Sequence, residues 1–291
     1  MKDKSMTVYP NAKINLGLFI TGRRSDGYHL LETGFLPIPL CDVLELSVLA
    51  DEEEDRLEVV GGIETGALSD NLVLRAVRAL RAVRALRAVR ALRAVRPFPA
   101  LSLRLAKHIP SGAGMGGGSA DASFTLTAVN ELCALGLSLE ELERIALGLG
   151  ADCPIFVRNQ PALGRGIGEV LTPLTLPQLA GYHLTIVKPE VHISTAEAFR
   201  GLLPIGPRET SLEVLLSQPV SSWSSSVIND FEPSLFPRYP ELKEIKAELY
   251  RLGADFALMT GSGAALYALS KEPLFLEAFE KKGYFLWQGR I

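Results

Sequence analysis

The sequence predicts an α+β protein made of two domains. With 291 residues, the chain is about twice the ~150 residues of a typical domain. Its residues are 47% hydrophobic, which is enough to fill two cores. Apolar segments with the pattern of strands are separated by helical segments and include a hairpin, an order typical of an α+β sandwich.

Composition narrows the class of protein. No apolar stretch approaches the ~18 residues of a membrane span, and the N-terminal residues lack the apolar core of a signal peptide. Cys41, Cys133 and Cys153 are far apart and form no Cys-x-x-Cys pair, which is typical of free thiols in a reducing compartment. The net charge of −3 suggests no polyanionic partner. We therefore expect a cytoplasmic protein with no membrane partner and no nucleic-acid partner.

The first part of the chain has the pattern of strands joined by polar loops. The apolar segments that predict strands are 7–9, 14–20, 35–49 and 57–60. The loop at 21–29 concentrates charged residues together with Tyr28 and His29, and loops on a rigid scaffold often carry function. The acidic run at 51–55 is predicted to be a solvated hairpin loop.

An arginine repeat interrupts this pattern. After a helix N-cap signal at 69–71, residues 75–96 repeat Arg-Ala-Val-Arg-Ala-Leu, with eight arginines and no acidic residue. A period of three differs from the 3.6 residues of a helical turn, so the apolar positions drift around the helix. We expect one helix enlarged by duplication, with only two or three triplets facing a core. A nucleic-acid-binding arm is the alternative, although no aromatic residues interleave to stack on bases.

The glycine-rich stretch at 110–123 is the strongest functional signal. An apolar strand segment at 101–105 precedes it and a helix-favouring run at 120–135 follows it. A strand, a glycine loop and a helix together present bare backbone N–H groups and the positive end of a helix dipole to an anion. The stretch is therefore predicted to hold phosphate groups.

The sequence disfavours three other interpretations of this stretch. The dinucleotide-binding pattern Gly-x-Gly-x-x-Gly is satisfied by Gly112, Gly114 and Gly117. A dinucleotide site also needs an acidic residue after a second strand, but the acidic residues that follow here lie in helical sequence. A Walker loop needs Gly-Lys-Ser/Thr, and no lysine lies between Lys107 and Lys188. An ordinary tight turn rarely needs so many glycines, because each one increases the entropy of the unfolded chain.

The rest of the chain alternates between helices and strands. Ser138 and Glu141 form a capping box for a helix that stops at Gly150, which places Asp152 in a loop. Further strands are predicted at 155–157, 168–171, 182–187, 256–259 and 265–269. Helices are predicted at 197–203, 240–252 and 271–282, and a serine-rich surface loop at 217–226.

Five segments together resemble the GHMP small-molecule kinases. The stretch at 110–123 is similar to their glycine-rich second motif. Within these kinases, the chain resembles the branch that phosphorylates a cytidine diphosphate derivative of methylerythritol in the non-mevalonate isoprenoid pathway. The segments that narrow the match are Ala12-Lys13-Ile14-Asn15-Leu16, Gly22-Arg23-Arg24-x-Asp26-Gly27-Tyr28-His29, Gly150-Ala151-Asp152-Cys153-Pro154 and Thr260-Gly261-Ser262-Gly263.

The resemblance implies a fold and a reaction. Residues 1–174 would form the ATP-binding domain, of the ribosomal-protein-S5 domain-2 type, and residues 175–291 a ferredoxin-like domain, with the active site in a cleft between them. The γ-phosphoryl group of ATP would pass to the 2-hydroxyl of the methylerythritol portion. ATP and Mg²⁺ are the implied cofactors, although the residues that bind the metal are not identified by it. The protein would be a monomer or a weak homodimer.

The resemblance also implies roles for individual residues. Asp152 would be the catalytic base, Lys13 its catalytic partner, and Asn15 would orient the substrate hydroxyl. The other substrate-binding residues would be Tyr28, His29, Thr195, Phe199, Gly261, Ser262 and Gly263, with the aromatic rings recognising cytosine. The nucleotide-binding residues would be Asn71, Pro110, Ser111, Gly112, Ala113, Gly114, Met115, Gly116, Gly117, Gly118, Ser119 and Ala120. Alternatives are a GHMP kinase for mevalonate or homoserine, and a nucleic-acid-binding protein that uses the arginine repeat.

Overall fold

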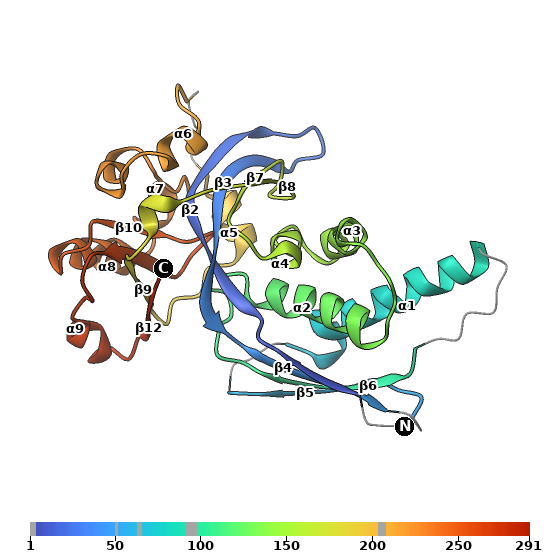
Figure 1. Ribbon diagram of the computed structural model, residues 1–291. Coiled ribbons are helices and arrows are strands. Elements are labelled where there is room, and N and C mark those ends of the chain that lie inside the picture. Colours follow the sequence, from blue (N-terminus) through green and yellow to red (C-terminus); the bar gives the residue numbers. More distant parts are fainter. Residues whose placement is uncertain (1–3, 50–51, 63–65, 91–97, 203–207) are drawn as a thin grey trace. The chain divides into compact units, whose positions relative to one another are not determined.

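The chain folds into two compact units. The computed structural model describes residues 4–49, 52–62, 66–90, 98–202 and 208–291, with side chains described to residue 85 in the third range (Figure 1). The first unit comprises Met1–Ala12, Cys41–Ser111 and Gly116–Asn159, and the second comprises Lys13–Leu40, Gly112–Met115 and Gln160–Ile291. The glycine stretch therefore contributes residues to both units. Across the described ranges, no helix is both long enough and apolar enough to span a membrane.

The first unit is a four-stranded sheet with helices packed on it. Its strand order is β1-β4-β6-β5, where β4 is antiparallel to β1 and β6, and β5 is parallel to β6. The strands are β1 (Ser5–Val8), β4 (Val43–Leu49), β5 (Arg56–Val60) and β6 (Ala100–Ala106). The helices are α1 (Leu72–Arg90), α2 (Gly117–Leu132), α3 (Leu139–Leu149) and α4 (Pro154–Arg158), with a 3₁₀ turn at Leu68–Asp70.

Alternation along the strands builds the core of this unit. Leu101, Leu103 and Leu105 of β6 are fully or almost fully buried, whereas Arg104 between them is exposed. A strand places successive side chains on opposite faces, so the leucines all point to the helices. α2 packs against α1, α3 and α4 in turn. This packing fixes the start of α2, whose first residues belong to the glycine stretch.

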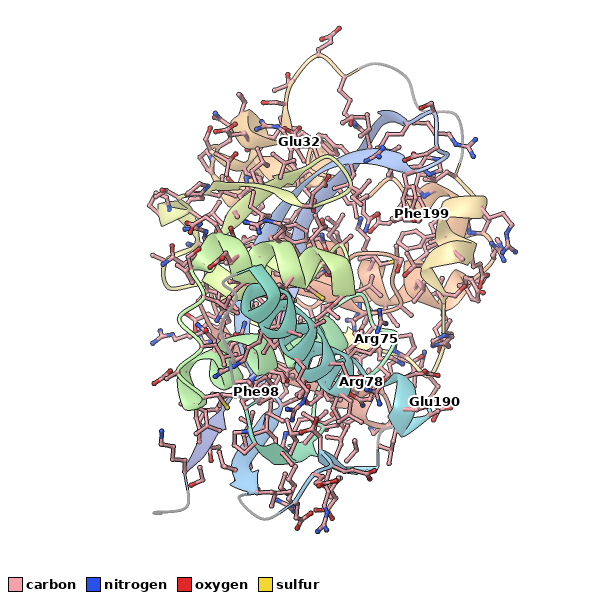
Figure 2. All side chains as sticks on the ribbon, turned by 90° about the vertical axis from the view of Figure 1, so that its right-hand side faces the viewer. Glu32, Arg75, Arg78, Phe98, Glu190 and Phe199 are labelled. Carbon is pink, nitrogen blue, oxygen red and sulfur yellow. The ribbon has the colours of Figure 1, made fainter. Side chains whose placement is uncertain are left out.

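Helix α1 shows how the arginine repeat begins. Its buried residues are Val73, Ala76, Val77 and Leu80, which share one helix face. Further along, Val83 is only partly buried and Ala85 is exposed, because the period of three carries the apolar positions away from that face. Arg75 and Arg78 project from the packed turns and are exposed (Figure 2). The first triplets of the repeat face the core as predicted, while the side chains of residues 86–90 and all of residues 91–96 lie outside the described part of the chain, so the prediction for the whole repeat stays a prediction.

Shortening the repeat tests this interpretation. Deleting two Arg-Ala-Val-Arg-Ala-Leu units should leave turnover intact or improved, because the remaining sequence still supplies identical residues to the packed turns. Turnover and thermal unfolding of the deleted chain would be compared with those of the full chain. A collapse of activity would give the repeat a role in catalysis. An RNA complex that is sensitive to salt, and lost on deletion, would support the nucleic-acid-binding alternative.

The second unit contains two four-stranded sheets. Their orders are β2-β3-β7-β8 and β10-β11-β9-β12, and all the strand pairs of the second sheet are antiparallel. The strands are β2 (Asn11–Arg23), β3 (His29–Cys41), β7 (Ala162–Arg165), β8 (Val170–Pro173), β9 (His183–Lys188), β10 (Phe256–Met259), β11 (Leu266–Ser270) and β12 (Phe285–Arg290). The helices are α5 (Thr195–Arg200), α6 (Leu212–Leu216), α7 (Glu232–Leu235), α8 (Pro240–Arg251) and α9 (Glu277–Glu280), with 3₁₀ turns at Pro177–Leu179 and Val220–Ser225. α8 packs on β10 and β11.

Several predicted elements were wrong. The apolar residues 155–157 lie in α4, because Pro154 starts a helix readily in its first turn. β5 does not form a hairpin with β4, since β6 lies between them, and Asp55 of the acidic run pairs with Arg81 of α1 at 2.5 Å. Segment 271–282 is helical only in α9, and residues 220–225 of the expected serine loop form a 3₁₀ turn with a buried Trp223.

Candidate active site

The backbone at the centre of the glycine stretch takes a conformation that favours glycine. Gly112, Gly114 and Gly116 all have φ between +61° and +73°, which is the left-handed region. A Cβ added to Gly114 would lie 2.1 Å from the carbonyl oxygen of Thr260, so the two backbones touch there. The middle of the stretch is thus held against the Thr260 turn within the second unit.

The end of the stretch becomes the first turn of α2. The first intrahelical bond runs from the backbone N–H of Ala120 to the carbonyl oxygen of Gly116 at 2.9 Å. The first N–H groups of a helix have no partner inside the helix, and they carry the positive end of its dipole. A Cβ on Gly118 would lie 3.6 Å from Cδ1 of Leu72, which places the start of α1 beside the start of α2.

Asn71 caps α1 at this place. Its Oδ1 accepts a hydrogen bond from the backbone N–H of Val73 at 2.9 Å, and the side chain is buried. This confirms the predicted N-cap signal. A role of Asn71 toward adenine remains a prediction.

Asp152 lies in the turn between α3 and α4, in the first unit. The Ser123 hydroxyl of α2 donates to the carbonyl oxygen of Cys153 at 2.7 Å. A Cβ on Gly150 would come within 4.0 Å of Oγ of Ser119. Burial of Cys153 raises the pKa of its thiol to about 11, so this cysteine is a neutral packing residue. The turn that carries Asp152 is therefore held next to the first turn of α2.

Lys13 lies in β2, with only 2% of its surface exposed. Its ammonium group donates to Oδ1 of Asn15 at 2.6 Å and to the carbonyl oxygen of Gly114 at 3.1 Å. Its backbone N–H donates to the carbonyl oxygen of Met115 at 3.0 Å. β2 thus brings the predicted catalytic lysine to the middle of the glycine stretch.

Asn15 is held by its neighbours in the second unit. Its backbone N–H donates to Oγ1 of Thr260 at 3.0 Å, and its side-chain NH₂ donates to Oγ1 of Thr33 at 2.9 Å. Because its Oδ1 accepts from Lys13, both ends of the amide are bonded. Asn15 therefore contacts the ammonium group of Lys13 directly, which the sequence did not predict, and its role toward the substrate hydroxyl remains a prediction.

Four predicted substrate residues gather at one turn. The hydroxyl oxygens of Thr195 and Ser262 are 3.3 Å apart. The side-chain nitrogen of Asn229 donates to the carbonyl oxygens of Met259 and Gly261, each at 2.8 Å. Asn229 was not among the predicted site residues, although it orients the turn that contains them. The predicted residues at this turn are Gly261, Ser262 and Gly263, and Thr195 contacts it from the start of α5.

The predicted aromatic residues differ in environment. The rings of His29 and Phe199 stack with their centroids 5.1 Å apart and an angle of 20° between them. Phe231 meets Phe199 edge to face at 5.0 Å, and Phe199 projects from α5 (Figure 2). Tyr28 is 61% exposed. Burial, followed by the positive charge of Arg23, lowers the pKa of His29, so its imidazole is neutral at pH 7.

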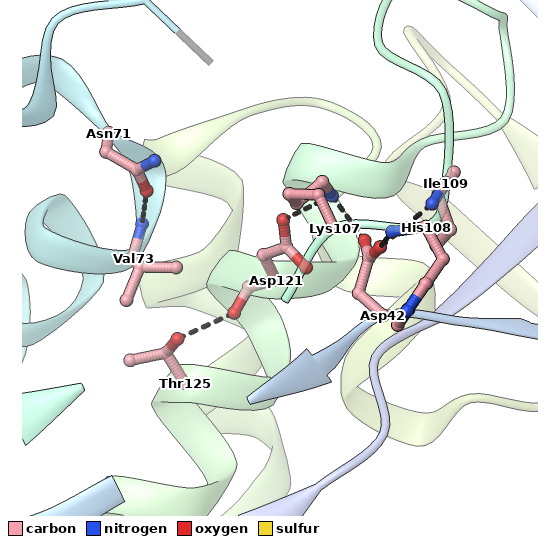
Figure 3. A network of polar contacts seen from close by, with 8 residues as sticks. All are labelled: Asp42, Asn71, Val73, Lys107, His108, Ile109, Asp121 and Thr125. Carbon is pink, nitrogen blue, oxygen red and sulfur yellow. Dashed lines mark hydrogen bonds and ion pairs between the residues drawn. The ribbon is translucent and has the colours of Figure 1, made fainter. Parts of the chain in front are cut away.

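One buried cluster was missed by the sequence analysis. Lys107, directly after β6, pairs with Asp42 and with Asp121 of α2 (Figure 3). The only hint in the sequence is a lysine at the end of an apolar strand just before the glycine stretch. Among the described residues, no group of three or more His, Cys, Asp and Glu side chains could hold a metal ion.

Relatives at the sequence level are kinases. The profile of the GHMP kinases N terminal domain matches residues 71–160, and that of the GHMP kinases C terminal domain matches residues 215–283. A 4-diphosphocytidyl-2-C-methyl-D-erythritol kinase of Porphyromonas gingivalis is 48% identical over 286 residues, which is 98% of this chain and 100% of that protein. The kinase of the same name from Bacteroides fragilis is 46% identical over 265 residues, 91% of this chain and 92% of that protein.

Solved structures agree with the sequence relatives. The crystal structure of a 4-(cytidine 5'-diphospho)-2C-methyl-D-erythritol kinase matches with a TM-score of 0.77 and 31% identity, over 98% of each chain. A mevalonate kinase matches with a TM-score of 0.72 at 14% identity over 98% of each chain, a likeness of fold alone. The predicted α+β fold of GHMP kinase type is confirmed. The chain therefore belongs to the GHMP kinases, and within them to the 4-diphosphocytidyl-2-C-methyl-D-erythritol kinase family.

Proposed function

We propose that this chain transfers the γ-phosphoryl group of ATP to the 2-hydroxyl of 4-diphosphocytidyl-2-C-methyl-D-erythritol. The observation that carries the proposal is the division of the glycine stretch. Its middle is bonded to Lys13 in the second unit, and its end becomes the helix start beside the Asp152 turn in the first unit. Within each unit, one predicted catalytic residue therefore lies beside the part of the stretch that belongs to that unit.

The backbone of the stretch would bind the ATP phosphates. Phosphoryl transfer requires alignment and neutralisation of charge more than covalent chemistry. The N–H groups of residues 112–118 and the first turn of α2 supply donors and a positive dipole. Pro110, Ser111, Ala113, Met115 and Ala120 would complete the lining, with Asn71 at the nucleoside end.

We propose that Mg²⁺ is bound together with ATP near the start of α2. The Ser119 hydroxyl lies at the helix start beside the Asp152 turn, and oxygen atoms of hydroxyl and carboxylate groups are ligands that Mg²⁺ accepts. Bound with ATP, the ion would neutralise part of the phosphate charge. Ser119 is the residue that we propose would face it.

Proton transfer is assigned to Asp152 and charge stabilisation to Lys13. The substrate hydroxyl must lose its proton as it attacks, and a carboxylate in a turn beside the phosphate-binding helix start is a suitable acceptor. The Lys13 ammonium group is fixed by Asn15 and Gly114, so it needs no reorganisation to stabilise developing negative charge.

The cytosine would be recognised by Tyr28, His29 and Phe199. Aromatic rings stack on a base, and a neutral imidazole can accept as well as donate a hydrogen bond at the edge of the base. The Thr195–Ser262 pair and the turn at Gly261 and Gly263 would contact the remainder of the substrate. We further propose a cytoplasmic enzyme that is a monomer or a weak homodimer.

A panel of alcohols tests the function. ADP release would be measured with ATP and, in turn, 4-diphosphocytidyl-2-C-methyl-D-erythritol, mevalonate and homoserine. We expect turnover only with the cytidine compound, since the alternatives of another alcohol or a nucleic acid are not favoured by the relatives. Turnover with mevalonate or homoserine alone would contradict the proposal.

The state of His29 gives a prediction about pH. Because burial and the charge of Arg23 lower its pKa, the His29 imidazole becomes charged only in more acidic solution than an ordinary histidine does. The KM for the cytidine substrate should therefore stay flat through the range in which an ordinary histidine begins to titrate, and rise only at lower pH. A rise that begins above pH 6.5 and disappears in His29→Gln would show that the imidazole titrates higher than expected.

A further inference from the structure

A buried ammonium group joins three separate segments of the first unit. Asp42 lies between β3 and β4, Lys107 follows β6, and Asp121 lies in the second turn of α2 (Figure 3). The side chains of Lys107, Asp42 and Asp121 are 3%, 0% and 5% exposed. Nζ of Lys107 lies 2.8 Å from Oδ2 of Asp121 and also donates to Oδ2 of Asp42.

The charges of this cluster do not balance. Two carboxylates share one ammonium group, and the second oxygen of Asp121 has no hydrogen-bond partner among the described residues. Burial, opposed by Lys107 and assisted by Asp42, raises the pKa of Asp121 to about 7. Burial of an ion costs several kcal/mol unless it is well paired, so a cluster that only filled space would be better made of apolar residues.

The cluster touches both ends of the glycine stretch. On the entry side, Oδ1 of Asp42 accepts hydrogen bonds from the backbone N–H groups of His108 and Ile109, which precede Pro110. On the exit side, Lys107 binds Asp121, and a Cβ on Gly117 would lie 3.5 Å from its Nζ. One ammonium group is therefore tied to the segments on either side of the loop.

We propose that Lys107 is a positioning residue that sets the spacing between the two ends of the glycine stretch. Through Asp42 it fixes the entry, and through Asp121 it fixes the exit, so the N–H groups between them keep their directions. A loop that is preorganised binds its ligand without the entropy cost of ordering. The inference rests on the proposed function only in taking the ligand of the stretch to be a nucleoside triphosphate.

Two substitutions of Asp121 separate positioning from stability. Asp121→Leu cuts the tie to α2 and leaves a balanced pair of Lys107 and Asp42, so the chain is expected to fold. Asp121→Asn keeps an oxygen atom that can accept from Lys107. We expect Asp121→Leu to weaken binding of a non-hydrolysable ATP analogue by about tenfold, and Asp121→Asn to restore it to within about threefold of the natural chain.

Two lysine variants complete the set. Lys107→Met should weaken binding of the analogue at least as much as Asp121→Leu. The control is Lys246→Met, which breaks another partly buried pair, with Glu232 in the second unit, and should lower thermal stability without changing binding of the analogue. If Asp121→Leu and Lys107→Met retain measurable turnover, their KM for ATP should rise while their KM for the alcohol substrate stays within about twofold.

The outcomes decide the proposal. A selective loss of nucleotide affinity in Asp121→Leu and Lys107→Met, with recovery in Asp121→Asn, supports it. Unchanged nucleotide affinity, a parallel rise in both KM values, or unfolding of Asp121→Leu while Asp121→Asn folds would overturn it and assign the cluster to stability. Binding of the analogue is measured without the alcohol, so an error in the proposed alcohol substrate leaves this result unaffected.

Discussion

Asp152→Asn should lower kcat by about 10²- to 10⁴-fold, the range usually associated with loss of a general base. The substitution keeps the size of the side chain and removes its ability to take a proton. Asp152 lies in a short turn whose neighbour Cys153 is anchored to Ser123, so we expect the turn to keep its shape. The KM for ATP should change little, because the phosphates are assigned to backbone N–H groups. Steady-state kinetics with both substrates would give the two values.

A matched variant separates chemistry from folding. Glu131→Gln makes the same change of carboxylate to amide on an exposed residue of α2 in the same unit, and its kcat should equal that of the natural chain. Turnover of Asp152→Asn close to that of the natural chain would remove Asp152 from the role of base. Such a result would shift attention to another group beside the start of α2.

Local patterns in the sequence predicted much of this fold. The capping box of Ser138 and Glu141 is present with both of its hydrogen bonds, and α3 ends at Leu149 as the following glycine suggested. The glycine stretch follows strand β6 and leads into helix α2, as predicted. These features depend on residues a few positions apart, so their physics is contained in a short segment.

Features that depend on distant residues were not predictable in this way. β5 pairs with β6 across the whole of α1, and a parallel neighbour leaves no signal in the sequence of either strand. The resemblance gave Asn15 a role near Lys13, but the bonds of Asn15 to Thr33 and Thr260 could not be predicted from it. Asp42 and Lys107 are 65 positions apart, so their pairing could be seen only after folding.

Lys13→Met should lower kcat by roughly 10²- to 10³-fold, as expected for loss of a preorganised group that stabilises charge in the transition state. Methionine preserves most of the buried stem of the side chain, which is 2% exposed, and removes the ammonium group that donates to Asn15 and Gly114. Lys243→Met, on an exposed residue of α8 in the same unit, is the control and should leave kcat unchanged. A loss of thermal stability with kcat preserved would make Lys13 a structural residue.

The double variant asks whether Lys13 and Asp152 act on one reaction step. The two residues lie in different compact units. Whether they act on one step is therefore tested by kinetics and not by the contacts within either unit. Groups that act together in a single step are strongly non-additive, because the second substitution removes what the first has already disabled. We expect the double variant to lose no more than about tenfold beyond the worse single variant. Losses that multiply would mean that Lys13 serves the phosphate-binding stretch and Asp152 the proton transfer, as two separate contributions to the rate.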